Sequence, residues 1–221
     1  MRQIYAQSSR QGHNPRIFTV VGDCNSDYPV YLGPVGVHLV DLSALPLPGC
    51  HRQPLLGFLL APQPCRAGRF QRRFDDGSDL GRPGPVPGSE GLLACELRVS
   101  HASIVFIALG TGDQFTWRDF EVHYRALIDY TLGRGVLPVL VTKADTLESL
   151  EGGAEPGYIN SVIRRPGQEY GVPVLDFSLA VRDLPNGGLL PNGGHDFHLN
   201  AAGIGRHILA TLQTLYVVLH P

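Results

Sequence analysis

The stretch Ile17-Phe18-Thr19-Val20-Val21-Gly22-Asp23-Cys24-Asn25-Ser26-Asp27 decides the fold. It opens with an unbroken run of apolar and β-branched residues, which is typical of a buried strand in a parallel sheet. The run stops at a glycine, and an acidic residue and a thiol follow. Ligands of open α/β sheets bind outside the carboxyl ends of the strands. The stretch therefore predicts a small nucleophile, Cys24, at the rim of a sheet.

Further along the chain, apolar runs alternate with helical spacing. Strands are predicted at 16–22, 103–109, 136–142 and 172–177, and helices at 117–134, 158–170 and 200–219. An irregular lead-in is predicted at 1–15, and loops at 143–156 and 185–194. Pro166 is expected to kink the second helix, because proline removes a helical hydrogen bond. The alternation predicts an α/β fold with a parallel sheet, right-handed crossovers and helices on both faces.

Residues 30–90 do not follow this pattern. Proline and glycine are dense there, as in 45–49 and 81–88, and the apolar patches at 39–47 and 55–60 fit either short helices or short strands. An ordered segment of this length without secondary structure is uncommon inside a compact domain. A flexible cap, an insertion, a poorly folding region and a compensated frameshift in the gene all fit this composition. We treat 1–221 as one domain with an irregular segment at about 30–90.

Composition and charge narrow the class of protein. The chain has 221 residues, a hydrophobic fraction of 43% and a formal net charge of −2, which suit one soluble domain with a core of moderate size. The near-neutral charge gives no indication of a nucleic-acid or membrane-surface partner. No apolar run has the length of a membrane span, and residues 1–14 lack the apolar region of a signal peptide. We expect a cytoplasmic protein, or an extracytoplasmic one if a signal precedes this sequence.

Cysteine and lysine usage adds two expectations. The cysteines are Cys24, Cys50, Cys65 and Cys95. No Cys-x-x-Cys pair occurs, so a zinc site made of cysteines is not expected. Cys65 and Cys95 could pair in an oxidising compartment, but free thiols are the default expectation. Lys143 is the only lysine, and we interpret the excess of arginine as a consequence of genome composition.

The first stretch resembles the first sequence block of the SGNH, or GDSL-type, hydrolases. In that family Gly-Asp-Ser follows the first strand, and the serine is the acyl-accepting nucleophile. Gly22 and Asp23 match, and Cys24 takes the serine position. The resemblance, which is to bacterial members, covers about 16–27 and 92–205. It implies a three-layer α/β/α sandwich with a mainly parallel, flavodoxin-like sheet, and a hydrolase of acyl or acetyl esters that needs no metal or organic cofactor.

A second block of the family follows the second predicted strand. SGNH hydrolases have Gly-x-Asn-Asp there, and the asparagine donates a hydrogen bond to the oxyanion. Gly110 and Asp113 match, whereas Gly112 replaces the asparagine and offers only a backbone N–H. Losing one such side-chain donor lowers kcat roughly 10²- to 10³-fold. Another oxyanion glycine of the family falls in the irregular segment, where Gly57 and Gly68 are candidates.

The last block of the family, Asp-x-x-His, precedes its closing helix. His198 matches the histidine base, His195 stands at the position of the aspartate, and Asp196 lies next to it. In an extended loop the side chains of residues i and i+2 point the same way, so contact between Asp196 and His198 is expected.

Acyl transfer needs a nucleophile, a base, an orienting acid and oxyanion donors. The resemblance assigns these roles to Cys24, to His198 and to Asp196 or His195. Asp23, Gly112 and Asp113 are the expected oxyanion and substrate-binding residues.

Each candidate also has a structural interpretation. Cys24 fits a buried structural thiol, and Asp23 fits a carboxylate that accepts hydrogen bonds from nearby backbone N–H groups. Asp113 fits a residue that leads into a helix. His195 and His198 lack a third metal ligand at a telling spacing. Three of the four signature side chains of the family are replaced. The alternative to an esterase acting on small-molecule or carbohydrate esters is therefore a catalytically impaired or non-catalytic SGNH-fold protein with a binding role; the oligomeric state stays open.

Overall fold

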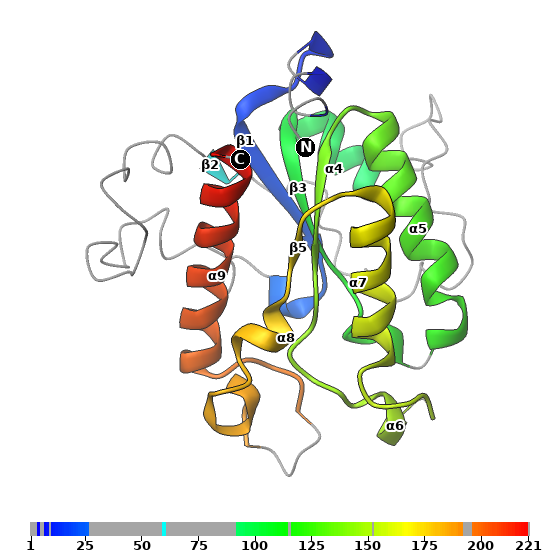
Figure 1. Cartoon of the computed structure of the whole chain (residues 1–221), viewed down its shortest axis with the longest axis vertical. Helices are drawn as coiled ribbons and strands as arrows, with labels where there is room; N and C mark the ends of the chain where they lie inside the picture. Colours follow the sequence, from blue (N-terminus) through cyan, green and yellow to red (C-terminus); the bar gives the residue numbers. More distant parts are fainter. Residues whose placement is uncertain are drawn as a thin grey trace.

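The computed structural model describes residues 4, 7, 8, 10–26, 59–60, 92–114, 116–151, 153–191 and 196–220 (Figure 1). Within these ranges, only the backbone is described for Cys24, Leu59, Leu60, Leu92, Gln114 and Glu151. Among these residues, no helix is long and apolar enough to cross a membrane. Nearly all of the segment at 30–90 lies outside this description, so its predicted irregularity is not tested.

The sheet is parallel between all neighbouring strands. Its strands are β1 (Asn14–Gly22), β2 (Leu59–Leu60), β3 (Ala102–Ala108), β4 (Leu137–Val141) and β5 (Val174–Leu175). Their order across the sheet is β2-β1-β3-β4-β5. This order is compatible with a flavodoxin-like fold, in which ligands bind where the connections from β1 and β3 diverge. The prediction of an α/β protein with a parallel sheet is thus confirmed.

Helices connect the strands and cover the sheet. The longer ones are α4 (Leu92–Ser100), α5 (Trp117–Gly133), α7 (Tyr158–Tyr170) and α9 (Ala201–Leu219). The short ones are η1 (Cys24–Ser26), η5 (Gly112–Gln114), α6 (Glu148–Glu151), α8 (Phe177–Ala180) and η6 (Pro185–Gly188). Figure 1 shows α9 on one side of the sheet and α5 and α7 on the other.

The core consists of two apolar clusters, one on each face of the sheet. Alternate residues of β1, β3, β4 and β5 belong to opposite clusters, because successive side chains of a strand point to opposite faces. Phe106 of β3 packs with α8 and α9, whereas its neighbours Val105 and Ile107 pack with α4, α5 and α7. All seven residues of β3 are buried, which explains its continuous apolar sequence. Each cluster therefore combines residues of the sheet with residues of helices.

Several predicted boundaries need correction. A helix, α4, precedes β3 where none was predicted, and α6 lies inside the predicted loop at 143–156. The predicted strand at 172–177 is reduced to two residues, since its last residue already begins α8. The helix predicted at 158–170 is continuous through Pro166, which is buried. Strand β1 begins two residues earlier than predicted, within the expected lead-in.

The turn after β1 is held tightly against β3. A Cβ atom on Gly22 would collide with the Ser26 hydroxyl and with the backbone carbonyl oxygen of Ala108. The N–H of Asp23 donates to the same carbonyl oxygen at 3.2 Å. Only glycine fits at position 22. The close approach brings η1 next to the end of β3.

Candidate functional site

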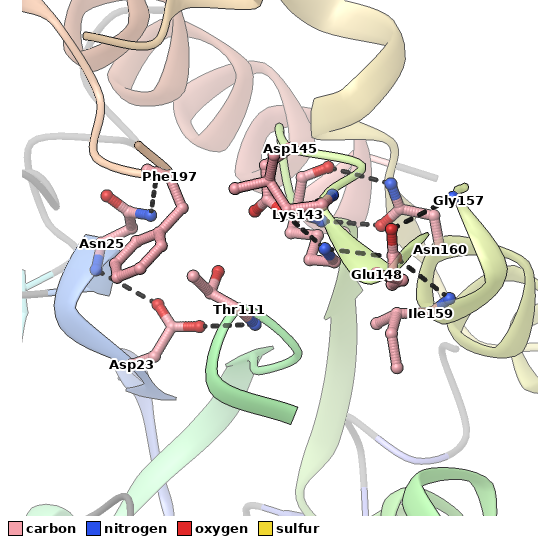
Figure 2. Close-up of polar contacts among 11 residues, drawn as sticks. Asp23, Asn25, Thr111, Lys143, Asp145, Glu148, Gly157, Ile159, Asn160 and Phe197 are labelled. Carbon is pink, nitrogen blue, oxygen red and sulfur yellow. Dashed lines mark hydrogen bonds and ion pairs between the residues drawn. The ribbon is translucent and has the colours of Figure 1, made fainter. Parts of the chain in front are cut away.

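Asp23 joins the loops that follow β1 and β3. Its Oδ1 accepts a hydrogen bond from the N–H of Asn25 at 3.1 Å, and its Oδ2 accepts one from the N–H of Thr111 at 3.1 Å (Figure 2). Burial raises the pKa of this carboxyl, while hydrogen bonds from Thr111 and Asn25 oppose the rise. The structural interpretation of Asp23 is therefore confirmed, since it accepts hydrogen bonds from two nearby backbone N–H groups.

Asp196 and His198 form a pair at the same edge of the sheet. His198 Nδ1 lies 2.6 Å from Asp196 Oδ1, and the backbone N–H of His198 donates to the same oxygen at 2.8 Å. The imidazole is 51% exposed and the carboxylate 12%. The ring of His198 also lies against that of Phe197, with centroids 4.4 Å apart. The expected contact between Asp196 and His198 is present, and Nε2 is the ring nitrogen that this contact does not use.

The backbone around His198 is held by the segment that follows α8. Leu190 N–H donates to the carbonyl oxygen of His198 at 2.9 Å, and Leu189 forms an antiparallel bridge with Leu199. Asn200 then caps α9, because its side chain accepts a hydrogen bond from Gly203 N–H at 2.9 Å. The histidine thus precedes a capped helix, in a loop with a defined backbone.

Asn25 connects this loop to the turn after β1. Its Nδ2 donates to the carbonyl oxygen of Phe197 at 2.9 Å (Figure 2), and its Oδ1 accepts from the N–H of Leu199 at 3.4 Å. The two contacted residues flank His198, and Asn25 directly follows Cys24. The structure therefore brings the predicted base and the backbone of the predicted nucleophile to neighbouring loops, although they are 174 positions apart in the chain.

A buried ionic cluster follows β4. Lys143 Nζ lies 2.5 Å from Asp145 Oδ1 and 3.2 Å from Glu148 Oε1 (Figure 2). The three side chains are 4%, 1% and 0% exposed, so one ammonium group balances two carboxylates away from solvent. Buried charges persist only when they are paired and hydrogen-bonded.

The same cluster fixes the loop between β4 and α7. The Asn160 side chain accepts from Lys143 N–H at 2.9 Å and donates to the carbonyl oxygen of Lys143 at 3.0 Å. Glu148 accepts from the N–H groups of Gly157 and Ile159 at the start of α7, at 3.2 and 3.3 Å. These contacts hold the loop between β4 and α7 in place at the carboxyl edge of the sheet.

A pocket lies at this edge, at the ends of β1, β3 and β4. Its polar lining includes Asp23, Asn25, Thr111, Thr142, Lys143 and His207. His207 comes from α9, is 3% exposed and packs against Phe177, with ring centroids 4.4 Å apart and the ring planes tilted by 58°. Burial lowers the pKa of His207 to about 4. His207 is therefore neutral at pH 7, and the pocket is a mixed polar and apolar space next to the loop that contains His198.

The remaining predicted site residues are only partly described. Cys24 begins η1, but its side chain lies outside the described part of the structure, as does all of His195. Gly112 and Asp113 lie in η5, which directly follows the loop contacted by Asp23. Their roles toward an oxyanion stay predictions, as does the role of Cys24.

One expectation about the cysteines is corrected. Cys95 of α4 is disulfide-bonded, so the default expectation of free thiols is wrong for this residue. The alternative of a pairing with Cys65 is not tested, because Cys65 lies outside the described residues.

Sequence reasoning missed Asn25, the cluster around Lys143 and His207. A signal existed for Lys143, since the only lysine of the chain directly follows a predicted strand and two acidic residues lie within five positions. Asn25 and His207 gave no comparable signal, because their partners are far away in the sequence.

Comparison with known proteins finds no family model that matches the chain. It also finds no curated protein that matches.

Proposed function

We propose that the chain is an SGNH-like hydrolase of carboxylic esters, in which Cys24 is the nucleophile, His198 the base and Asp196 the orienting acid. The observation that carries the proposal is the contact between Asp196 and His198, in a loop hydrogen-bonded to the turn that Cys24 begins. The proposal includes the three-layer sandwich of that family, with which the parallel sheet and its strand order are compatible.

In the first step, the Cys24 thiol gives its proton to Nε2 of His198, and Sγ attacks the carbonyl carbon of the ester. The tetrahedral intermediate collapses, the bond to the alcohol oxygen breaks, and His198 returns the proton to that oxygen. The products of this step are a thioester on Cys24 and the free alcohol.

In the second step, a water molecule gives a proton to His198 and its oxygen attacks the thioester carbon. The carbon–sulfur bond breaks, the carboxylic acid leaves, and the proton returns to the Cys24 thiolate. Asp196 accepts a hydrogen bond from Nδ1 in both steps, which keeps Nε2 free to transfer protons and stabilises the imidazolium. Gly112 supplies a backbone N–H to the oxyanion.

The chemistry of the two loops supports this proposal over a purely structural one. A thiolate is a better nucleophile than a neutral hydroxyl, and a neighbouring imidazolium lowers the pKa of a thiol. An orienting carboxylate that is 12% exposed, next to an imidazole that is 51% exposed, leaves the histidine accessible to substrate. A short acyl or acetyl ester of a small molecule or a sugar is the proposed substrate.

The test is hydrolysis of p-nitrophenyl acetate and p-nitrophenyl butyrate by the wild type and four variants. We expect activity to be lost in Cys24→Ala and His198→Ala, and retained or raised in Cys24→Ser. His123→Ala, which alters a partly buried histidine on α5, is the matched control and should leave activity unchanged.

Folded protein with no activity above buffer in the wild type and in Cys24→Ser would contradict the proposal. That result would favour the alternative, a non-catalytic protein that keeps the fold and binds a small molecule at the same edge of the sheet.

A further inference from the structure

Asn25 contacts the loop that contains His198, the proposed base. The residue is half-buried in η1 and lines the pocket at the carboxyl edge of the sheet. Its backbone N–H donates to Asp23, so its main chain is tied to the loop after β1. Its side-chain amide points the other way, toward the loop before α9 (Figure 2).

The amide contacts one peptide group on each side of His198. It donates to the carbonyl oxygen of Phe197 at 2.9 Å and accepts from the N–H of Leu199 at 3.4 Å. A carboxamide carries both a donor and an acceptor, whereas a carboxylate has only acceptors and an alanine has neither. The contact with Phe197 therefore needs the N–H donor that asparagine has and its isostere aspartate lacks.

These contacts bear on the distance between base and nucleophile. His198 is bound to Asp196 and to Leu190, both of which belong to the part of the chain that leads into α9. Asn25 joins that part of the chain to the turn after β1, which contains Cys24. A shift of about 1 Å between two reacting groups can cost about 10²-fold in rate.

We infer that Asn25 is a positioning residue, whose side chain holds the loop of His198 at the distance from Cys24 that proton transfer requires. The inference rests on the proposed function, because it takes Cys24 and His198 as the reacting pair. The role that it gives to Asn25 is to hold the loop of His198, not to carry a proton.

The test compares Asn25→Ala and Asn25→Asp with Asn14→Ala. Asn14 begins β1, at the end of the strand opposite to the turn that contains Asn25, and it is exposed, so it serves as the matched control. We expect both Asn25 variants to lower kcat for p-nitrophenyl acetate roughly 10- to 100-fold while KM changes less than about threefold. Asn25→Asp should be as poor as Asn25→Ala, because a carboxylate would face the carbonyl oxygen of Phe197.

A second readout follows Cys24 directly. The rate of Cys24 alkylation by iodoacetamide, mapped by peptide mass spectrometry, is measured against pH. In the wild type and in Asn14→Ala, we expect the pH at which alkylation reaches half of its maximal rate to lie below about 8.5, the pKa of an ordinary thiol. In the Asn25 variants this pH should rise toward about 8.5. In His198→Ala it should rise whether or not Asn25 is also substituted.

A third readout does not depend on catalysis. Amide hydrogen exchange at Leu199 should accelerate in Asn25→Ala, which removes the acceptor of this N–H, and stay unchanged in Asn14→Ala. Faster exchange together with wild-type kcat and a wild-type alkylation profile would overturn the positioning role while leaving the proposed function intact. A wild type that lacks both hydrolysis and alkylation dependent on His198 would overturn the proposed function itself, and the inference with it.

Discussion

Two charged groups of side chains lie at the same edge of the sheet and differ in almost every physical respect. The cluster of Lys143, Asp145 and Glu148 is at most 4% exposed, and it is tied to backbone groups of its own loop and of α7. The pair of Asp196 and His198 is 12% and 51% exposed. The comparison indicates that the first group determines the shape of the edge, whereas the second retains a nitrogen that solvent and substrate can reach.

This difference follows from solvation. A charge away from water must find partners within the protein, and those partners then fix the backbone to which they belong. A half-exposed imidazole keeps part of its contact with water. We therefore expect substitutions in the buried cluster to change stability, and substitutions in the exposed pair to change activity with little change in stability.

The largest effect on stability is expected for Lys143→Met, which keeps the aliphatic stem but removes the ammonium group. Two buried carboxylates would lose their counter-charge, and breaking a buried pair in this way costs about 3–5 kcal/mol. Urea denaturation measures the change in the free energy of unfolding.

Arg125→Met is the control for Lys143→Met, since Arg125 pairs with Glu121 and Glu169 on the surface. Its loss should cost less than about 1 kcal/mol, the usual value for an exposed ion pair. Equal losses in the two variants would contradict the distinction between the buried and the exposed groups.

The second largest effect on stability is expected from the protonation of His207, which lines the pocket at the carboxyl edge of the sheet. Its pKa is lowered from 6.5 to about 4 by burial, so the unfolded chain binds its proton at a higher pH than the folded protein. This histidine therefore makes the protein less stable as the pH falls from 6.5 to about 4, by on the order of 3 kcal/mol in total. Asp23, whose pKa is raised, acts in the opposite direction.

Urea denaturation at pH 7 and at pH 4 isolates the contribution of His207. We expect His207→Leu to lose less stability than the wild type between these two pH values, because the contribution of Asp23 is common to both proteins. His123→Leu, on α5, should behave as the wild type. The same pH dependence in His207→Leu and the wild type would show that His207 is not held neutral by burial.

The smallest effect on stability is expected for Asp196→Asn. A half-exposed pair contributes little, so the free energy of unfolding should change by less than about 1 kcal/mol. Hydrolysis should nevertheless fall roughly 10²- to 10⁴-fold, because the amide no longer fixes the orientation and protonation of His198. Unchanged hydrolysis with unchanged stability would remove Asp196 from the catalytic group.

Much of the fold was predictable because local pattern and burial agree. The continuous apolar sequences of β1 and β3 and the helical spacing of α5 and α9 each identify one element. Strand β5 was predicted too long, since Asp176 caps the short helix α8 by accepting from Leu179 N–H at 3.1 Å. A cap of this kind ends a strand without any change in hydrophobicity.

The site was predictable only where its partners are close in sequence. Asp196 and His198 are two positions apart, so the sequence indicated their contact. The contacts of Asn25 with Phe197 and Leu199 span more than 170 positions, and those of Lys143 depend on how α7 packs on β4. Such contacts arise from topology, which residue spacing alone does not contain.

The measurement that tests the central claim most directly is mass spectrometry of protein quenched in acid during the hydrolysis of p-nitrophenyl acetate. We predict an acetyl group on the peptide that contains Cys24 in the wild type, a slower approach to that state in His198→Ala, and no acetyl group on that peptide in Cys24→Ala. Hydrolysis by folded wild type at a rate equal to that of Cys24→Ala, with no acetylated Cys24 at any time, would contradict the account.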